Sequence, residues 1–136
     1  MLTNPFTGQT LERISEDREL LVMESTYAPG GAPAPPHLHP AQEERFVVLS
    51  RALRAAVDGE RMTLREGDEL TVAAGTPHEF GGHPELAGRV RWEVRPPLRS
   101  WELFTGLFES LRAHADGRGD EVDFDVADYA DVFRPA

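Results

Sequence analysis

Two histidines separated by one residue, His37 and His39, are the clearest candidates for chemistry in this sequence. In an extended segment alternate side chains share a face, so both imidazoles could point at one ion. Two glutamates follow shortly, Glu43 and Glu44, and a third histidine, His78, comes after a separate apolar run. Three imidazoles and a carboxylate form a nitrogen-and-oxygen donor set suited to a divalent transition metal. The spacing therefore predicts a metal site.

Two other interpretations of the histidine pair stay open. A single histidine is commonly an ordinary surface or hydrogen-bonded side chain, and Pro36 and Pro40 could make this segment a stiff, solvated linker. The surrounding sequence favours ligation, because the pair precedes the β-forming run 46–49 and His78 follows another such run. The proline-rich segment 29–36 would then be an ordered loop whose stiffness positions the ligands in advance.

Composition limits the possible function classes. A chain of 136 residues with 40% hydrophobic content is long enough for one domain with a core. It has no cysteine, which excludes disulfides, thiolate nucleophiles, zinc fingers and iron–sulfur clusters. A formal charge of −10 disfavours nucleic acid and anionic membranes as partners. With no basic and apolar leader in residues 1–5 and no run able to cross a bilayer, we expect a cytoplasmic protein.

The elements that must position the histidines read as short β-strands separated by glycine and proline turns. Asp58-Gly59 is a strong hairpin signal, because both residues tolerate positive φ. Across 89–95, apolar residues alternate with charged ones, which is typical of a strand with one buried and one wet side. Strands are predicted at 19–27, 45–49, 52–57, 61–64, 69–73 and 89–95. Together they predict an all-β antiparallel sandwich or barrel.

The character of the chain changes after Pro96-Pro97. Ser100 could cap a helix that stops at Gly117. Apolar side chains recur along this helix at helical spacing: Trp101, Phe104, Leu107, Phe108 and Leu111. We expect this stripe to pack on the outside of the sheets or on a second subunit. The aspartate-rich tail 116–131 is interpreted as a solvated extension that lacks a calcium-loop pattern, although its apolar residues indicate that it docks somewhere.

The motifs resemble those of the cupin family of small β-barrels. The first family motif, G-x(5)-H-x-H-x(3,4)-E-x(6)-G, is met by Gly31, His37, His39 and Glu44, with Arg51 in the place of the last glycine. We choose Glu44 over Glu43 for its distance from that last position and because Glu44, like the residues two and four positions on, would face inward. A left-handed backbone at Arg51 would cost on the order of 1 kcal/mol, so this turn is expected to differ in shape.

The second family motif, G-x(5)-P-x-G-x(2)-H-x(3)-N, is met by Gly67, Gly75 and His78. Ala73 replaces its proline and Gly82 replaces its asparagine, which changes the scaffold and leaves the ligands intact. The resemblance covers roughly 19–97. It implies a double-stranded β-helix, or jelly-roll cupin barrel, over 1–98, followed by a C-terminal helix and acidic tail over 99–136 that pack on the barrel or on a dimer partner.

The resemblance further implies a divalent ion, one of iron, manganese, nickel, zinc or copper, held inside the barrel by His37, His39, Glu44 and His78. A small organic molecule would bind in an apolar pocket beside it. Residues expected to line that pocket are Phe46, Val48, Val72, Val90, Trp92 and Phe80. We interpret His83 and His114 as non-ligands, and expect Glu43 and Glu79 to point away from the cavity, which leaves no assigned catalytic residue.

Two functions from different classes follow from this resemblance. The favoured one is a metal-dependent oxidoreductase, most plausibly a dioxygenase of the quercetinase kind that acts on an enolate or catechol-like compound. The alternative is a non-enzymatic barrel that binds or senses a small metabolite, which the lack of acid–base candidates would explain. In either case the apolar helix and the family's habit of pairing through sheet edges predict a homodimer.

Overall fold

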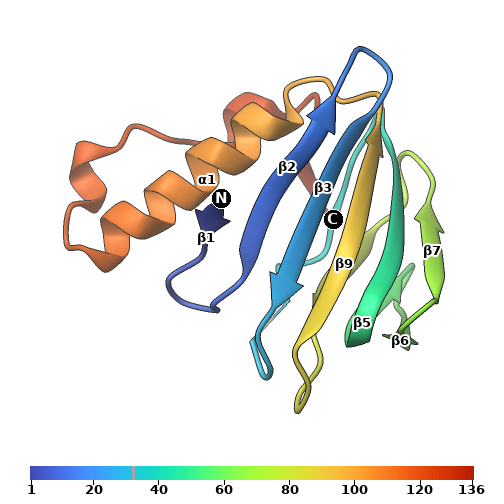
Figure 1. Ribbon diagram of the computed structural model, residues 1–136. Helices are drawn as coiled ribbons and strands as arrows, with labels where there is room; N and C mark the ends of the chain where they lie inside the picture. The colour runs from blue at the N-terminus through green and yellow to red at the C-terminus, as the bar shows by residue number, and fades with distance from the viewer. Residues whose placement is uncertain (32) are drawn as a thin grey trace.

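The strands of the protein form one antiparallel sheet that is folded into two facing layers, as the computed structural model shows (Figure 1). The structure describes residues 1–31 and 33–136. The ten strands of these residues are β1 (Leu2–Thr3), β2 (Thr10–Glu16), β3 (Leu21–Tyr27), β4 (His37–Leu38), β5 (Glu43–Val57), β6 (Glu60–Arg65), β7 (Glu69–Val72), β8 (His78–Gly82), β9 (Gly88–Arg95) and β10 (Arg134–Pro135). Along the sheet they are ordered β1-β2-β3-β9-β5-β8-β4-β10, with β6 and β7 also paired to β5. The predicted all-β jelly-roll class is confirmed.

Strand β5 belongs to both layers and connects them. Its first half pairs with β7 and β9, and its second half pairs with β6 and β8. A bulge between Val48 and Ser50 shifts the inward-facing positions from even to odd residue numbers. The two strands predicted at 45–49 and 52–57 are therefore one bent strand. The expected change of shape at Arg51 is wrong, because Arg51 adopts a left-handed φ of 55°.

Aromatic side chains form the centre of the core between the layers. Phe46 stacks on Phe80 with ring centroids 4.3 Å apart and on Trp92 at 5.5 Å. These side chains come from β5, β8 and β9, where alternate residues point inward. The hairpin predicted at Asp58-Gly59 is confirmed, with both residues at positive φ. The alternation of β9 thus places the ring of Trp92 in this aromatic core.

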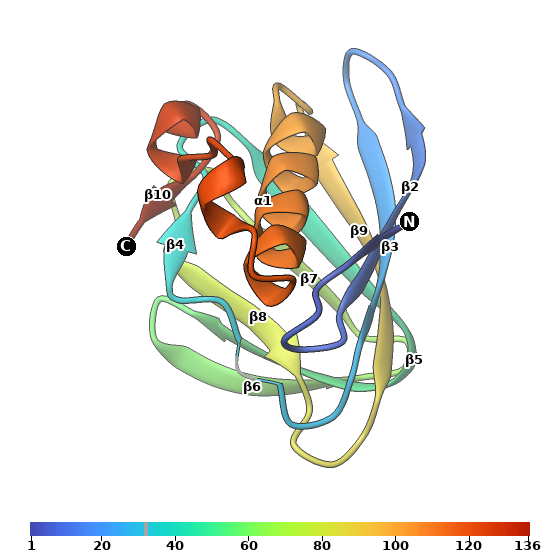
Figure 2. The same ribbon diagram turned by 90° about the vertical axis from the view of Figure 1, so that its left-hand side faces the viewer.

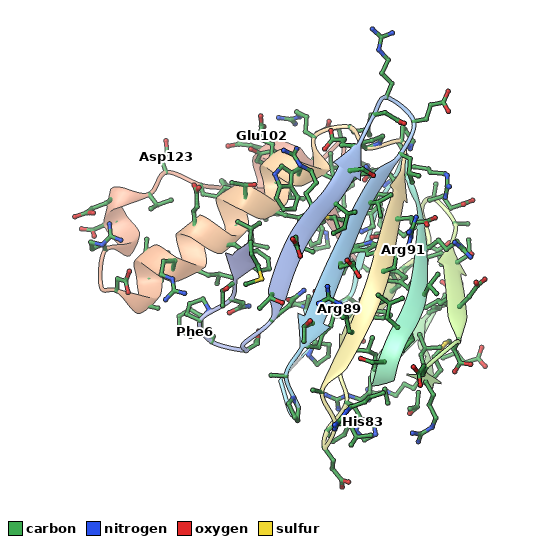
Figure 3. The ribbon with its side chains drawn as sticks, viewed as in Figure 1. Phe6, His83, Arg89, Arg91, Glu102 and Asp123 are labelled. Atoms are coloured by element: carbon green, nitrogen blue, oxygen red, sulfur yellow. The ribbon has the colours of Figure 1, made fainter. Side chains whose placement is uncertain are left out.

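The outward face of β9 is not uniformly exposed to solvent. Glu93 is only 4% exposed although it lies on the outer side of the sheet. Arg91 Nε donates to its carboxylate over 2.9 Å, Arg95 over 3.1 Å and Arg45 over 3.4 Å. Figure 3 shows Arg89 and Arg91 along this outer face. The arginines cover the carboxylate and satisfy it, so a charged residue is buried there without an unpaired charge.

Helix α1 (Ser100–Ala115) lies across the open side between the two layers (Figure 2). Phe104 packs on the inward-facing ring of Trp92 with centroids 5.0 Å apart. The expectation that the helix covers the outside of the sheets is therefore wrong, and it closes the interior instead. Within the described residues no helix combines the length and the apolar character that crossing a membrane requires.

The two ends of α1 have different determinants. The predicted N-cap role of Ser100 is wrong, since Arg99 occupies the N-cap position and the Ser100 hydroxyl accepts from Gln42 Nε2 over 2.8 Å. The predicted stop at Gly117 is confirmed by its φ of 75°. Arg118 N–H donates to the Ala113 carbonyl across that glycine, the pattern of a Schellman ending.

The acidic tail returns to the barrel after two short 3-10 helices, Gly119–Glu121 and Val126–Tyr129. Val132 is fully buried, and Phe133 packs against the core. Strand β10 then pairs with β4, with Arg134 opposite Leu38. The prediction that the apolar tail residues dock is confirmed, whereas a simple solvated extension is not what the tail forms.

Candidate metal centre

Strand pairing brings the three predicted histidines together. His37 lies on β4 and is paired directly with His78, the first residue of β8. His39 follows β4 by one residue and shares its inward side with His37. One ring nitrogen from each of the three lies within 4.8 Å of the others. These residues could therefore hold one metal ion between them.

Each imidazole is fixed by a backbone carbonyl on its Nδ1 side. His37 Nδ1 contacts the Pro35 carbonyl at 2.9 Å, and His78 Nδ1 contacts the Thr76 carbonyl at 2.9 Å. His39 Nδ1 contacts the carbonyl of Val132 at 2.7 Å. A carbonyl can only accept, so each Nδ1 carries the proton and donates it. In the neutral ring the Nε2 lone pair is then free, which is the tautomer that metal ligation needs.

Glu44 brings a carboxylate to the same point. It is 1% exposed, and its Oε1 lies 3.0 Å from His39 Nε2 and 2.7 Å from His78 Nε2. Its second oxygen, Oε2, accepts a 2.7 Å hydrogen bond from the indole N–H of Trp92. Glu43, the alternative considered from the sequence, is exposed on the opposite side of β5. Of the two glutamates, only Glu44 faces the histidines.

The inner atoms of this cluster fit a cation. His39 Nε2, His78 Nε2 and Glu44 Oε1 are buried and have no hydrogen-bond partner among residues 1–31 and 33–136. With the protons on Nδ1, both Nε2 lone pairs face the carboxylate oxygen with no proton between them. Buried acceptors arranged in this way are costly unless a positive charge lies between them. A divalent ion would satisfy all of them at once.

The ionisation states of His37 and Glu44 agree with this fit, whereas Glu44 favours a proton on His78 that a bound ion would displace. Burial lowers the pKa of His37 to about 4, which keeps that imidazole neutral. Burial opposes the charge on Glu44, but its contacts with His39 and His78 outweigh burial and lower the pKa of Glu44. Burial likewise acts to lower the pKa of His78, and the contact with Glu44 reverses this and raises it. A neutral imidazole and an ionised carboxylate are the forms that bind metal.

The loop before the histidines is held against β8 by close backbone contacts. A Cβ atom added at Gly81 would lie 2.8 Å from the Cβ of Pro33. At Gly82, it would lie 2.5 Å from the Ala28 carbonyl oxygen. The glycines therefore let the loop approach the strand that carries His78. Ala32, within the segment 29–36 expected to be stiff, lies outside the described residues.

The residues expected to line a pocket all face the interior. Phe46, Val48, Val72, Phe80, Val90 and Trp92 are each 9% exposed or less. Burial raises the pKa of the Tyr27 hydroxyl, whose ring lies 5.7 Å from that of Phe80. Tyr27 also borders a cavity of about 260 Å³ that Phe108 of α1 and Gly82 of β8 help to line. Aromatic rings thus extend from this cavity to the carboxylate of Glu44.

The side chains expected to be non-ligands or to point away lie outside the cluster. Figure 3 shows His83 in the loop after β8, at one end of the sheet. Its Nδ1 accepts from the backbone N–H groups of Glu85 and Leu86. His114 lies on α1, where its Nδ1 contacts the Ser110 carbonyl. Glu79 pairs with Ala56 across β5 and β8 on the outer face.

Two functional contacts were missed by the sequence analysis. Trp92 was expected only as a pocket wall, yet its N–H is the partner of Glu44. The carbonyl of Val132, the partner of His39, lies 93 residues away in the chain. A backbone carbonyl has no sequence signature, so only the docking of the apolar tail hinted at this contact.

Comparison with known proteins agrees with the motifs and the fold. The family model described as "Cupin domain" matches residues 23–92. A 46-residue stretch is 41% identical to quercetin 2,3-dioxygenase of Bacillus subtilis, which is 34% of this chain but only 14% of that enzyme.

Solved structures also resemble this one in fold. An RmlC-like cupin from Shewanella frigidimarina matches with a TM-score of 0.65 and 18% identity, over 74% of this chain and 87% of that one. KdgF from Halomonas sp. matches at 0.60 and 21%, over 65% and 79%. The polyketide cyclase RemF from Streptomyces resistomycificus matches at 0.58 and 21%, over 68% of each. At these identities the likeness concerns the fold, and together with the matched domain it means that this chain belongs to the cupin family.

Proposed function

We propose that the protein binds a divalent transition metal through Nε2 of His37, His39 and His78 and through Oε1 of Glu44. The observation that carries this proposal is the fixed tautomer of the three imidazoles, each with its Nδ1 proton donated to a carbonyl. A hydrogen bond from the other ring nitrogen to a backbone carbonyl is typical of metal-ligating histidines. The buried Nε2 and Oε1 atoms of the cluster are left for the ion.

The donor atoms determine the chemistry that a bound ion would supply. Three imidazoles and a carboxylate suit iron, manganese, nickel, zinc or copper. With four protein ligands, such an ion keeps room for an exogenous molecule and supplies Lewis-acid or redox chemistry there. The protein's own contribution is a buried site in which the three imidazoles and the Glu44 carboxylate already lie close together.

Trp92 has a specific part in this arrangement. Its N–H occupies Oε2 of Glu44 and leaves Oε1 directed at the histidines. The indole ring also stacks in the aromatic core with Phe46, which stacks in turn on Phe80. Trp92 thus joins the carboxylate of the metal site to the packed core.

We further propose that the reaction is that of a dioxygenase-like oxidoreductase on a small organic molecule. The local identity to quercetin 2,3-dioxygenase supports this. The molecule would enter from the cavity beside Tyr27, whose ring lies 5.7 Å from that of Phe80 in the core.

The test is turnover by metal-loaded protein. Preparations loaded with iron, nickel or copper are incubated with flavonol, catechol and β-diketone compounds, and oxygen uptake and product are followed together. We expect uptake that His78→Ala abolishes and that the matched variant His83→Ala, outside the cluster, retains. Neither uptake nor product with any loaded preparation would contradict the dioxygenase proposal.

A second candidate, a non-enzymatic binding or sensing barrel, is favoured by one observation. Two titratable side chains are adjacent to the proposed ligands in sequence, Glu43 and Glu79. Both point away from the histidine cluster. If this candidate holds, an aromatic ligand binds tightly to metal-free protein and to His37→Ala. Binding that depends entirely on the ion would count against it.

We also propose that the protein is a homodimer that pairs through a sheet edge. The apolar stripe of α1 is used within the chain, since Leu103, Phe104 and Phe108 are buried. Strand β2, by contrast, pairs with the outermost strand β1 only at Thr10 and Leu11, and the rest of its outer edge carries the half-exposed Ile14. Light scattering at micromolar concentration should give twice the mass of the chain, and a monomer would contradict the proposal.

A further inference from the structure

The last six residues of the chain, 131–136, lie over the metal centre, and we call them the C-terminal strap. Strand β10 of the strap pairs with β4, placing Pro135 opposite His37 (Figure 2). The N–H of Ala136 donates to the Pro36 carbonyl over 3.0 Å. Val132 is 0% exposed. The strap is therefore an integrated edge of the sheet that carries the first two histidines.

The strap touches two of the three histidines. The carbonyl of Val132 accepts the Nδ1 proton of His39 at 2.7 Å. The ring of Phe133 stacks on His37, with centroids 4.7 Å apart and planes inclined by 24°. His39 is only 5% exposed with the strap in place. The strap thus orients one imidazole and covers another.

His39 differs from the other two histidines in the origin of its partner. His37 and His78 donate to carbonyls two residues before them in the chain, so their orientation is set locally. The partner of His39 lies 93 residues away and exists only while the strap is docked. Undocking the strap would free the His39 ring to rotate and to exchange tautomers.

We propose that docking of the strap and binding of the metal are thermodynamically linked, with Val132 and Phe133 acting as positioning residues for His39 and His37. This inference rests on the proposed metal site. A bound ion fixes the histidine rings in the orientation that the strap recognises, and the docked strap presents those rings to the ion. Because linkage is reciprocal, the factor by which the strap strengthens metal binding equals the factor by which metal stabilises the docked strap.

The expected size of this linkage follows from the role of groups that hold a ligating histidine in place. Losing such a partner typically weakens metal affinity about 10–100-fold. Metal should therefore lower the equilibrium fraction of undocked strap by about the same factor, which amide hydrogen exchange measures. The two experiments report one number from opposite sides of the cycle.

The strap is also anchored at a point away from the histidines. Arg99 donates to the Asp131 carboxylate at 2.6 Å and to the Asp128 carbonyl at 2.9 Å. Its guanidinium also lies 4.6 Å from the centre of the Tyr129 ring. A change at Arg99 loosens the strap without touching a ligand, so any effect on metal affinity must pass through the strap.

The experiment compares Phe133→Ala and Arg99→Leu with the wild type in Zn²⁺ and Ni²⁺ affinity, measured by competition with a chromophoric chelator. Phe6→Ala is the control, because it removes an exposed phenyl ring from the loop between β1 and β2, outside the strap and its anchor. We expect Phe133→Ala to lose about 10–100-fold in affinity and Arg99→Leu to lose less, with Phe6→Ala within about twofold. Exchange of the strap amides in the wild type should slow on metal addition.

Two results would overturn the inference. If the wild type binds metal and both strap variants bind equally well, the strap does not position the ligands, while the metal site itself stands. If metal leaves the exchange of the strap amides unchanged, the linkage is absent. A wild type that binds neither ion contradicts the proposed metal site and removes this inference with it.

Discussion

Replacing Trp92 with phenylalanine tests how Glu44 is held in the metal centre. The change keeps an aromatic ring against Phe46 and Phe104 but removes the N–H that donates to Oε2 over 2.7 Å. Both partners are buried, so the oxygen that loses this bond cannot turn to water. A carboxylate left with an unsatisfied oxygen in the core is destabilising.

The magnitude can be separated from lost packing by a double-mutant cycle. Hydrogen bonds to charged groups contribute about 1.5–3 kcal/mol, and Trp92→Phe should lose this in addition to a packing loss. Glu44→Leu removes the acceptor while keeping a similar volume. In the cycle formed by Trp92→Phe, Glu44→Leu and the double variant, the packing losses cancel, and the coupling energy should be about 1.5–3 kcal/mol.

The assay is urea denaturation in the presence of a chelator, so that metal does not contribute to the stability. A second measurement, chelator competition with Zn²⁺, should place the affinity of Trp92→Phe about 10–100-fold below that of the wild type. Coupling within about 0.5 kcal/mol of zero would refute the reasoning, because the two side chains would then act independently.

Three further predictions follow, two on the scaffold and one on the limits of the metal site. Arg51→Gly should stabilise the protein by about 1 kcal/mol in urea denaturation by relieving the left-handed φ, whereas Arg51→Ala should give no such gain. Glu93→Gln should lose about 1–3 kcal/mol at pH 7. Burial opposes the charge of Glu93, but its arginine partners outweigh burial and hold its pKa below the ordinary 4.5. The wild type should therefore exceed Glu93→Gln in free energy of unfolding by the full amount above pH 4.5. This difference should disappear as the pH falls through the folded pKa, and a constant difference down to pH 2 would contradict the prediction. The His83→Ala and His114→Ala variants should keep the wild-type metal stoichiometry, and a loss in either would place a ligand outside the proposed cluster.

The grouping of His37, His39 and Glu44 could be predicted from sequence because their spacing is local and their strand pattern is regular. His37 and His39 alternate across an extended segment, and Glu44 falls on the inward side of β5. The fold followed from the same alternation, most clearly along β9. Period and spacing are properties of neighbouring residues, so a single sequence contains them.

The features that sequence analysis got wrong depend on packing between distant segments. The sequence shows that α1 has an apolar stripe but not which surface the stripe packs on. Phe104 contacts Trp92 because the helix fits the space between the two layers. Ser100 has the residue type of an N-cap, yet Gln42 uses its hydroxyl. Arg51 keeps a left-handed backbone because the bend in β5 requires it, although its side chain disfavours that conformation. Tertiary context decided each of these outcomes.

Metal stoichiometry measures whether the three imidazoles and Glu44 bind one metal ion. Untagged protein is purified without a metal-chelate column and dialysed against Ni²⁺ or Zn²⁺, and its metal content is determined by elemental mass spectrometry beside Glu44→Gln and His78→Ala. We expect about one ion for each wild-type chain and a large loss in both variants. A wild type without metal, or variants that retain as much as the wild type, would contradict it.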